Sequence, residues 1–170
     1  MIVNQSCIHS IWPYIDSIPT DWYHDGVHYC IEKGLMIGIG DDLWAPDIPL
    51  PRAMMAQVLY NNAGKPAVSG DGVFDDVDQT WYWPAITWGA RNNVLWGYGD
   101  GSYGPQDSIT REQLATLLWR YAGQPQTDGQ LNFSDAAEVS DYAKQALIWA
   151  SQQGVILGHP DGTFRPQDYA

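Results

Sequence analysis

The sequence predicts an all-α protein made of three consecutive helix–loop–helix repeats. One observation is the segment around residues 110–121, where Thr110 and Gln113 stand at capping-box spacing. Behind them, Leu114, Leu117, Leu118 and Tyr121 recur at the spacing of one helix face. The other observation is that the pattern returns along the chain. The recurring positions are Pro46, Pro105 and Pro166, then Gly38, Gly97 and Gly158, and the pair Arg52 and Arg111.

The first repeat is predicted over residues 15–66, after a segment, 1–14, that matches nothing downstream. Its first helix is expected over 22–33, with Asp21 as the N-cap and Gly34 as the left-handed residue that ends it. Its second helix is expected over 52–62.

The second repeat is predicted over 67–125 and the third over 126–170. The second opens at Phe74, and Asn93 takes the place of Gly34. The third opens at Phe133 and reaches residue 170 where its second helix is expected to begin. Repeats of this kind bury their apolar faces against one another. We therefore expect an open apolar face on the third repeat, covered by residues 1–14, by a second copy or by a further segment.

Composition and charge narrow the classes of partner. The chain has 170 residues, of which 45% are hydrophobic, and a net charge of −12. A chain this acidic is not expected to bind nucleic acid or an anionic membrane surface. No apolar run predicts membrane insertion, and the N-terminus does not resemble a signal peptide, so an exported parent protein would contribute this chain as a mature or excised piece. Cys7 and Cys30 are too few for a disulfide framework, and whether they pair is left open.

The repeat unit reads Phe-x-Asp, then Trp-Tyr-x-x-Ala-Ile, a glycine, Asp-Gly-x-Phe-x-Pro and finally Ile-Thr-Arg-Glu. This pattern resembles the S-layer homology family, over about residues 15–170. The resemblance implies three repeats packed as one pseudo-threefold body. It also implies non-covalent anchoring of an extracellular protein to the bacterial cell wall. The implied ligand is an anionic secondary cell-wall polysaccharide, often pyruvylated, bound in grooves between repeats.

The resemblance implies a key arginine at the start of each second helix. Ile109-Thr110-Arg111-Glu112 matches the family motif well, whereas the first repeat keeps only Arg52 and the third has no such motif. The resemblance therefore implies at most two grooves able to bind the ligand. Arg111 is the leading candidate for ligand binding, and Arg52 is the second. An arginine beside free helix amides suits a carboxylate. The implied ligand-binding residues are Arg111, Arg52, Glu112, Thr110, Trp81, Trp22, Asp100 and Asp41.

Each of these residues also has a purely structural interpretation. Arg111 is then a surface residue paired with Asp107 or Glu112, and the loop aspartates Asp41, Asp100 and Asp161 cap their own turns. For Trp88 and Trp149, core packing is the favoured interpretation.

Other chemistries find little support in the sequence. Residues 99–104 fit G-x-G-x-x-G but lack the βαβ context of a dinucleotide site. His24 and His28 have helical metal-ligand spacing without a third ligand. We therefore predict a protein that is not an enzyme and has no cofactor or metal. The alternative hypothesis is a structural module, in which the open face of the third repeat joins a second copy or a docking partner.

Overall fold

The computed structural model describes residues 13–170, which form two compact units, one ending at Ile48 and the other running from Pro49 to Ala170. Among these residues every regular element is a helix, and no strand is present. The all-α prediction is therefore confirmed. Residues 1–12, which include Cys7 and most of the predicted 1–14 segment, lie outside the described residues.

The first unit contains one helix, α1, which runs from His24 to Glu32. The predicted N-cap at Asp21 is wrong, because α1 begins after Tyr23 and has no side-chain cap. The carboxylate of Asp21 instead accepts from the Ile18 amide at 2.8 Å, in the turn before the helix. The predicted end is confirmed: Gly34 has a φ of 63°, in the left-handed region.

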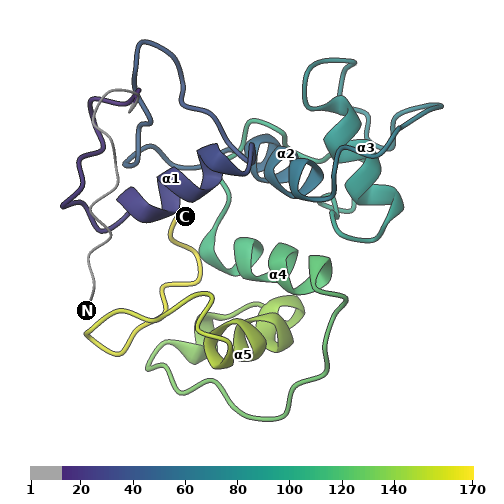
Figure 1. Cartoon of the computed structure of the whole chain (residues 1–170). Coiled ribbons are helices and arrows are strands. Elements are labelled where there is room, and N and C mark those ends of the chain that lie inside the picture. Colours follow the sequence, from purple (N-terminus) through teal and green to yellow (C-terminus); the bar gives the residue numbers. More distant parts are fainter. Residues whose placement is uncertain (1–12) are drawn as a thin grey trace. The chain divides into compact units, whose positions relative to one another are not determined.

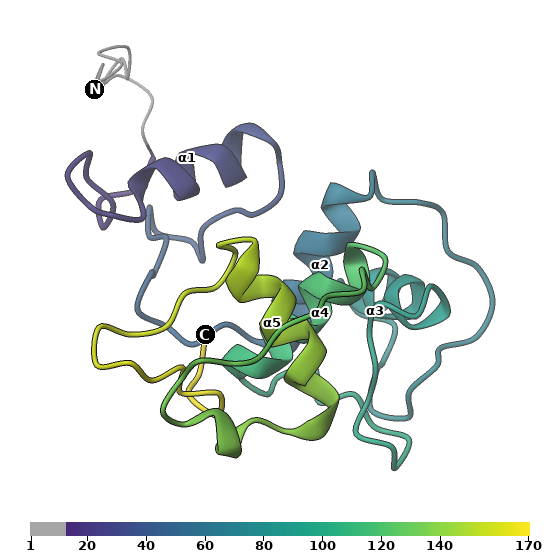
Figure 2. The ribbon, with the colours of Figure 1, turned by 90° about the horizontal axis from the view of Figure 1, so that it is seen from below.

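The second unit is built from two helix pairs, which Figures 1 and 2 show side by side. Helix α2 (Arg52–Asn62) packs against α3 (Trp83–Arg91), and α4 (Arg111–Tyr121) packs against α5 (Lys144–Gln152). Each pair joins the second helix of one predicted repeat to the first helix of the next. The predicted repeats therefore bury apolar helix faces against one another, as expected.

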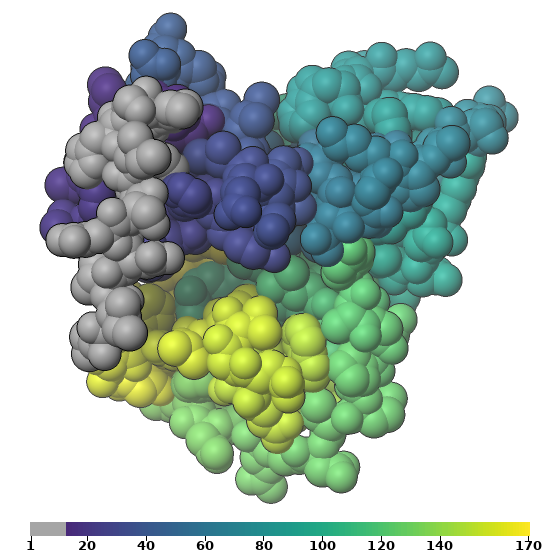
Figure 3. Space-filling model, viewed as in Figure 1, coloured from purple at the N-terminus to yellow at the C-terminus, as the bar shows by residue number. Residues whose placement is uncertain are grey.

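Two short 3-10 helices, η1 (Ala136–Glu138) and η2 (Asp141–Ala143), lead into α5. Helix α4 begins with the predicted capping box, in which Thr110 and Gln113 satisfy each other's backbone amides. Trp88 packs against the α2–α3 core and Trp149 against the α4–α5 core, as expected. Figure 3 shows the yellow C-terminal segment beside the green segments that contain α4.

An aspartate clamp recurs at the opening of each predicted repeat. The two carboxylate oxygens of Asp76 accept from the amides of Tyr103 and Gly104, both at 2.8 Å. Asp135 does the same for Phe164 and Arg165, at 2.8 and 2.7 Å. In the first unit, Asp16 holds Trp44 and Ala45, at 2.8 and 2.6 Å. Each clamp ties the start of a repeat to the loop that leads to its second helix.

A closed triangle of backbone hydrogen bonds lies within the second unit. Ile109 donates to the Leu50 carbonyl at 2.8 Å, Ala170 donates to Ile109 at 3.0 Å, and Leu50 donates to Ala170 at 3.1 Å. Leu50 and Ile109 each stand two residues before an arginine that opens a helix. Backbone hydrogen bonds thus join these three turns in a ring, and the pseudo-threefold packing of three repeats stays a prediction.

Candidate functional site

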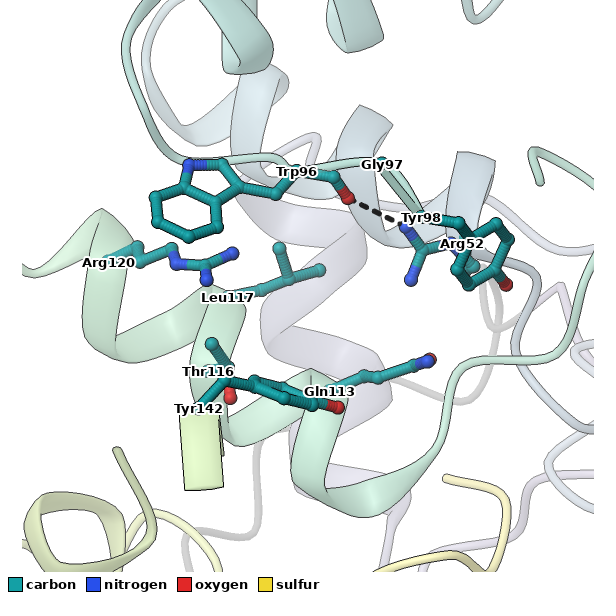
Figure 4. A pocket seen from close by; sticks show the side chains of 9 residues that line it. All are labelled: Arg52, Trp96, Gly97, Tyr98, Gln113, Thr116, Leu117, Arg120 and Tyr142. Carbon is teal, nitrogen blue, oxygen red and sulfur yellow. Dashed lines mark hydrogen bonds between the residues drawn. The ribbon is translucent and has the colours of Figure 1, made fainter. Parts of the chain in front are cut away.

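The candidate site is a cavity of about 350 Å³ in the second unit. Three elements supply its wall: the start of α2, the loop over 96–98, and one face of α4, with η2 at the rim (Figure 4). Its size suits a small ligand, for which pockets of about 300–1,000 Å³ are usual. The lining residues are Arg52, Trp96, Gly97, Tyr98, Gln113, Thr116, Leu117, Arg120 and Tyr142.

Arg52 is fixed in the wall of this pocket. It is only 5% exposed, and its Nε and Nη2 donate to the carbonyls of Tyr103 and Trp96, at 2.9 and 3.0 Å. Its guanidinium carbon lies 4.9 Å from the ring centre of Tyr98 and 4.5 Å from that of Tyr103. Burial raises the pKa of Tyr103 to about 12, although the nearby Arg52 charge opposes that rise. Arg52 therefore joins α2 to the loop of the following repeat.

Arg120, near the end of α4, is held in a different way. Its guanidinium carbon lies 3.7 Å from the ring centre of Trp96, which is a close cation–π contact (Figure 4). Within residues 13–170 the guanidinium has no hydrogen-bond or ion-pair partner. Burial lowers the pKa of Arg120, and the positive charge of Arg52 lowers it further. The pocket thus contains two cations that repel one another.

Two tyrosines reach the pocket, and each donates its hydroxyl to a carboxylate. Tyr98 donates to Asp107 at 2.8 Å and Tyr142 donates to Glu112 at 2.9 Å. The pKa of Tyr142 is raised, first by burial and then by its bond to Glu112. The same two factors, burial and the bond to Asp107, raise the pKa of Tyr98. Both phenols therefore remain neutral and point their protons away from a ligand.

Arg111, the leading sequence candidate, repeats the geometry of Arg52 but does not line this pocket. Its Nε and Nη2 donate to Phe164 and Leu157, at 2.9 and 2.8 Å, and its guanidinium carbon lies 4.8 Å from the Phe164 ring centre. Burial lowers its pKa. The expected ion pair with Asp107 or Glu112 is wrong, since the guanidinium bonds to backbone carbonyls instead. A ligand-binding role for Arg111 stays a prediction.

Glu112 and Thr110 have structural partners. Glu112 is 2% exposed, and its carboxylate accepts from the Ser140 amide at 3.0 Å, the Ser140 hydroxyl at 2.8 Å and Tyr142. The expectation that Glu112 holds the Arg111 guanidinium is therefore wrong: it fixes η2 on α4. Thr110 caps α4. Their contact with a ligand stays a prediction.

The remaining sequence candidates lie outside the pocket lining. Trp81 is 59% exposed, and Trp22, in the first unit, is 93% exposed, so both rings are open to solvent. Asp100 caps its own turn by accepting from the amide and hydroxyl of Ser102, at 2.9 and 2.6 Å. Asp41 has a left-handed φ of 49° in its turn. No group of histidine, cysteine and acidic residues among residues 13–170 could hold a metal ion.

Sequence reasoning missed four pocket residues, Trp96, Tyr98, Arg120 and Tyr142. A signal for one of them was present, because Gln113, Leu117 and Arg120 recur at i, i+4 and i+7 and so share a face of α4. The others lie in a loop and a short 3-10 helix, where no periodicity indicates what they face.

The fold and the recurring clamps define an all-α repeat protein. Residues 73–115 and 132–170 match the S-layer homology domain. The chain belongs to this family, as the motifs indicated. Within residues 13–170 no helix has the length and apolar character needed to cross a bilayer.

Three relatives illustrate where such modules occur. An S-layer protein of Bacillus thuringiensis subsp. finitimus is 30% identical over 82% of this chain and 17% of its own length. A cellulosome-anchoring protein of Acetivibrio thermocellus is 29% identical over 76% of this chain and 31% of that protein. The exoglucanase XynX of the same organism is 26% identical over 91% of this chain and 15% of that enzyme. The chain spans less than a third of each relative. It is an S-layer homology module like those of bacterial cell-surface proteins.

Proposed function

We propose that this chain anchors a surface protein non-covalently to an anionic secondary cell-wall polysaccharide, and that the pocket of Figure 4 binds one acidic unit of that polymer. The observation that carries the proposal is the charge of the pocket. Two of the eight basic residues of the chain line it, and none of its lining residues is acidic. In a chain of net charge −12, such a site favours an anion through local charge alone. We also propose that the chain is divided into repeats at 15–66, 67–125 and 126–170.

The shape and lining of the pocket agree with a sugar ligand. Trp96 is 55% exposed and Tyr98 is 50% exposed, so aromatic surface lies beside the guanidinium groups. Apolar surface with a few placed polar groups is the usual lining of a small-molecule site. A pyruvyl ketal carboxylate on a hexose would match this combination of charge and ring surface.

The experiment is co-sedimentation of the chain with purified Gram-positive cell walls, before and after acid extraction of the secondary polymer. We expect the chain to sediment with intact walls and to stay in the supernatant with extracted walls. Equal sedimentation with both preparations would mean that another wall component is bound. No sedimentation with walls from several hosts would contradict anchoring.

Self-association remains the second candidate function, and one observation favours it. Leu157 takes the place of Trp96 in the third repeat, because the carbonyl of Trp96 accepts from Arg52 and that of Leu157 accepts from Arg111. The apolar side chain of Leu157 is nevertheless exposed, at 67%. A second copy that covered this loop would bury apolar surface. Light scattering at increasing protein concentration tests this candidate. A monomer throughout would exclude it.

A further inference from the structure

The two pocket arginines differ in what remains available to a ligand. We infer that Arg120, and not the repeat arginine Arg52, contacts the negatively charged group of the ligand; this inference rests on the proposed anion-binding function. Arg52 instead fixes the pocket wall. The assignment reverses the expectation from the repeat motif, which places the binding role on the arginine that opens the second helix.

Arg52 is buried and has fewer unused donors than Arg120. Two carbonyls already accept from its Nε and its Nη2, and the rings of Tyr98 and Tyr103 lie close to its guanidinium carbon. Only Nη1 has no hydrogen-bond partner in the described part of the chain. Each Nη carries two hydrogens, so both hydrogens of Nη1 and one of Nη2 have no partner and could still bind a carboxylate. Because Arg52 is only 5% exposed, whereas Arg120 is partly exposed, a ligand reaches these donors less readily than those of Arg120.

Arg120 is the opposite case. All its donors are unused within the described residues, while Trp96 covers the face of its guanidinium and holds its direction. Burial lowers the pKa of Arg120 and the Arg52 charge adds to this effect, although Tyr142 opposes it, so the net effect of the surroundings is to disfavour the cation. A bound anion would relieve both effects, because it would pair with Arg120 and screen it from Arg52.

The tyrosines restrict the ligand further. Since Tyr98 and Tyr142 donate their only protons to Asp107 and Glu112, their oxygens can offer a ligand only lone pairs. A ligand that satisfies the pocket therefore needs an acidic group for Arg120 and hydroxyl donors beside it. An acidic sugar with free hydroxyls has both, whereas inorganic sulfate has only the charge.

The experiment is isothermal titration calorimetry of the whole chain with short fragments of the purified wall polymer. We expect Arg120→Gln to weaken binding about 10- to 100-fold, the usual range for losing a charge-assisted hydrogen bond. Its melting temperature should stay within about 3 °C of wild type, because no protein hydrogen bond is lost. Arg120→Lys should recover part of the binding. Lys65→Gln removes the same charge at an exposed site outside the pocket and serves as the matched control.

Arg52→Lys separates the two arginines. Under conditions in which both variants are folded, its affinity should fall less than that of the matched variant Arg120→Lys. The inference is overturned if Arg120→Gln binds like wild type, or if Arg52→Lys binds more weakly than Arg120→Lys. Absence of binding by wild-type protein contradicts the proposed function itself, and the inference fails with it.

Tyr98→Phe tests the sugar part of the inference. Removing this phenol oxygen should weaken the binding of the polymer fragments several-fold. It should leave unchanged the affinity of inorganic sulfate, measured by competition for the same pocket. An equal effect on both ligands, or on neither, would contradict the role of Tyr98 as an acceptor for ligand hydroxyls.

Discussion

Replacing Arg52 with alanine should destabilise the second unit strongly. The substitution removes two hydrogen bonds from a charged group, at 2.9 and 3.0 Å, each worth about 1.5–3 kcal/mol. It also removes two cation–π contacts, worth about 0.5–1 kcal/mol each or more when buried. Because these contacts share one side chain and are not additive, we expect a loss of about 3–5 kcal/mol in the free energy of unfolding. At about 2–4 °C per kcal/mol for a chain of this size, the melting temperature should fall by about 6–20 °C.

The same reasoning ranks three arginines of the second unit. Arg111→Ala removes an equal set of carbonyl bonds but only one ring contact, from a less buried side chain, so we expect about 1–3 kcal/mol. Arg120→Ala removes a ring contact alone, which predicts a loss of about 0.5–1 kcal/mol. Urea unfolding followed by circular dichroism at 222 nm measures all three. A loss for Arg52→Ala no larger than that for Arg120→Ala would refute the structural role of Arg52.

Three further predictions concern stability. Gly97→Ala should lower the free energy of unfolding by about 2–4 kcal/mol, because the added Cβ would overlap the Ser102 carbonyl oxygen. Gly26→Ala should instead raise it by about 0.5–1 kcal/mol, because Gly26 lies inside α1 and an added Cβ would meet nothing within 4 Å. Urea titrations of both variants compare the two effects. Thr110→Ala should lower it by about 1 kcal/mol, since one half of the capping box is lost, while Thr110→Ser should retain most of the stability in the same assay. Burial acts to raise the pKa of Asp135, but the two clamp amides outweigh it, so the folded pKa is lower than the unfolded value of 3.8. The ionised carboxylate therefore stabilises the folded state above the unfolded pKa, and this stabilisation is lost as pH falls through the lower folded pKa. Melting curves between pH 7 and 2 should therefore decline below about pH 4 for wild type and less steeply for Asp135→Asn; equal slopes would contradict the clamp.

Local signals in the sequence were sufficient for the helices. The boundaries of α2 were predicted correctly, and the capping box of α4 was read from the spacing of Thr110 and Gln113, because caps and apolar periodicity are properties of one short segment. The start of α1 was wrong for an equally local reason. Asp21 had the side chain of an N-cap, but its carboxylate bonds to the preceding turn. Short-range competition of this kind is hard to resolve from residue type alone.

The site was predicted less well, because its contacts join residues far apart in the chain. Arg52 bonds to carbonyls 44 and 51 residues away, and a carbonyl acceptor has no signature in the sequence. Glu112 looked like a partner for its neighbour Arg111, yet it accepts from Ser140 and Tyr142, about half a repeat later. The motif identified the family correctly while suggesting the wrong partners for two of its residues.

The repeat symmetry also explains why one pocket stands out. Each repeat arginine joins its helix to the next loop, so Arg52 and Arg111 serve the same structural purpose in two places. The residues that line the pocket do not follow this symmetry. Asn61 occupies the place of Arg120 on α2, and Leu157 occupies the place of Trp96 in the last loop. Only the pocket over α4 therefore combines a free guanidinium with a tryptophan among residues 13–170. The contacts that Arg52 and Arg111 share hold the fold together in two places, whereas the proposed binding site depends on residues that differ between them.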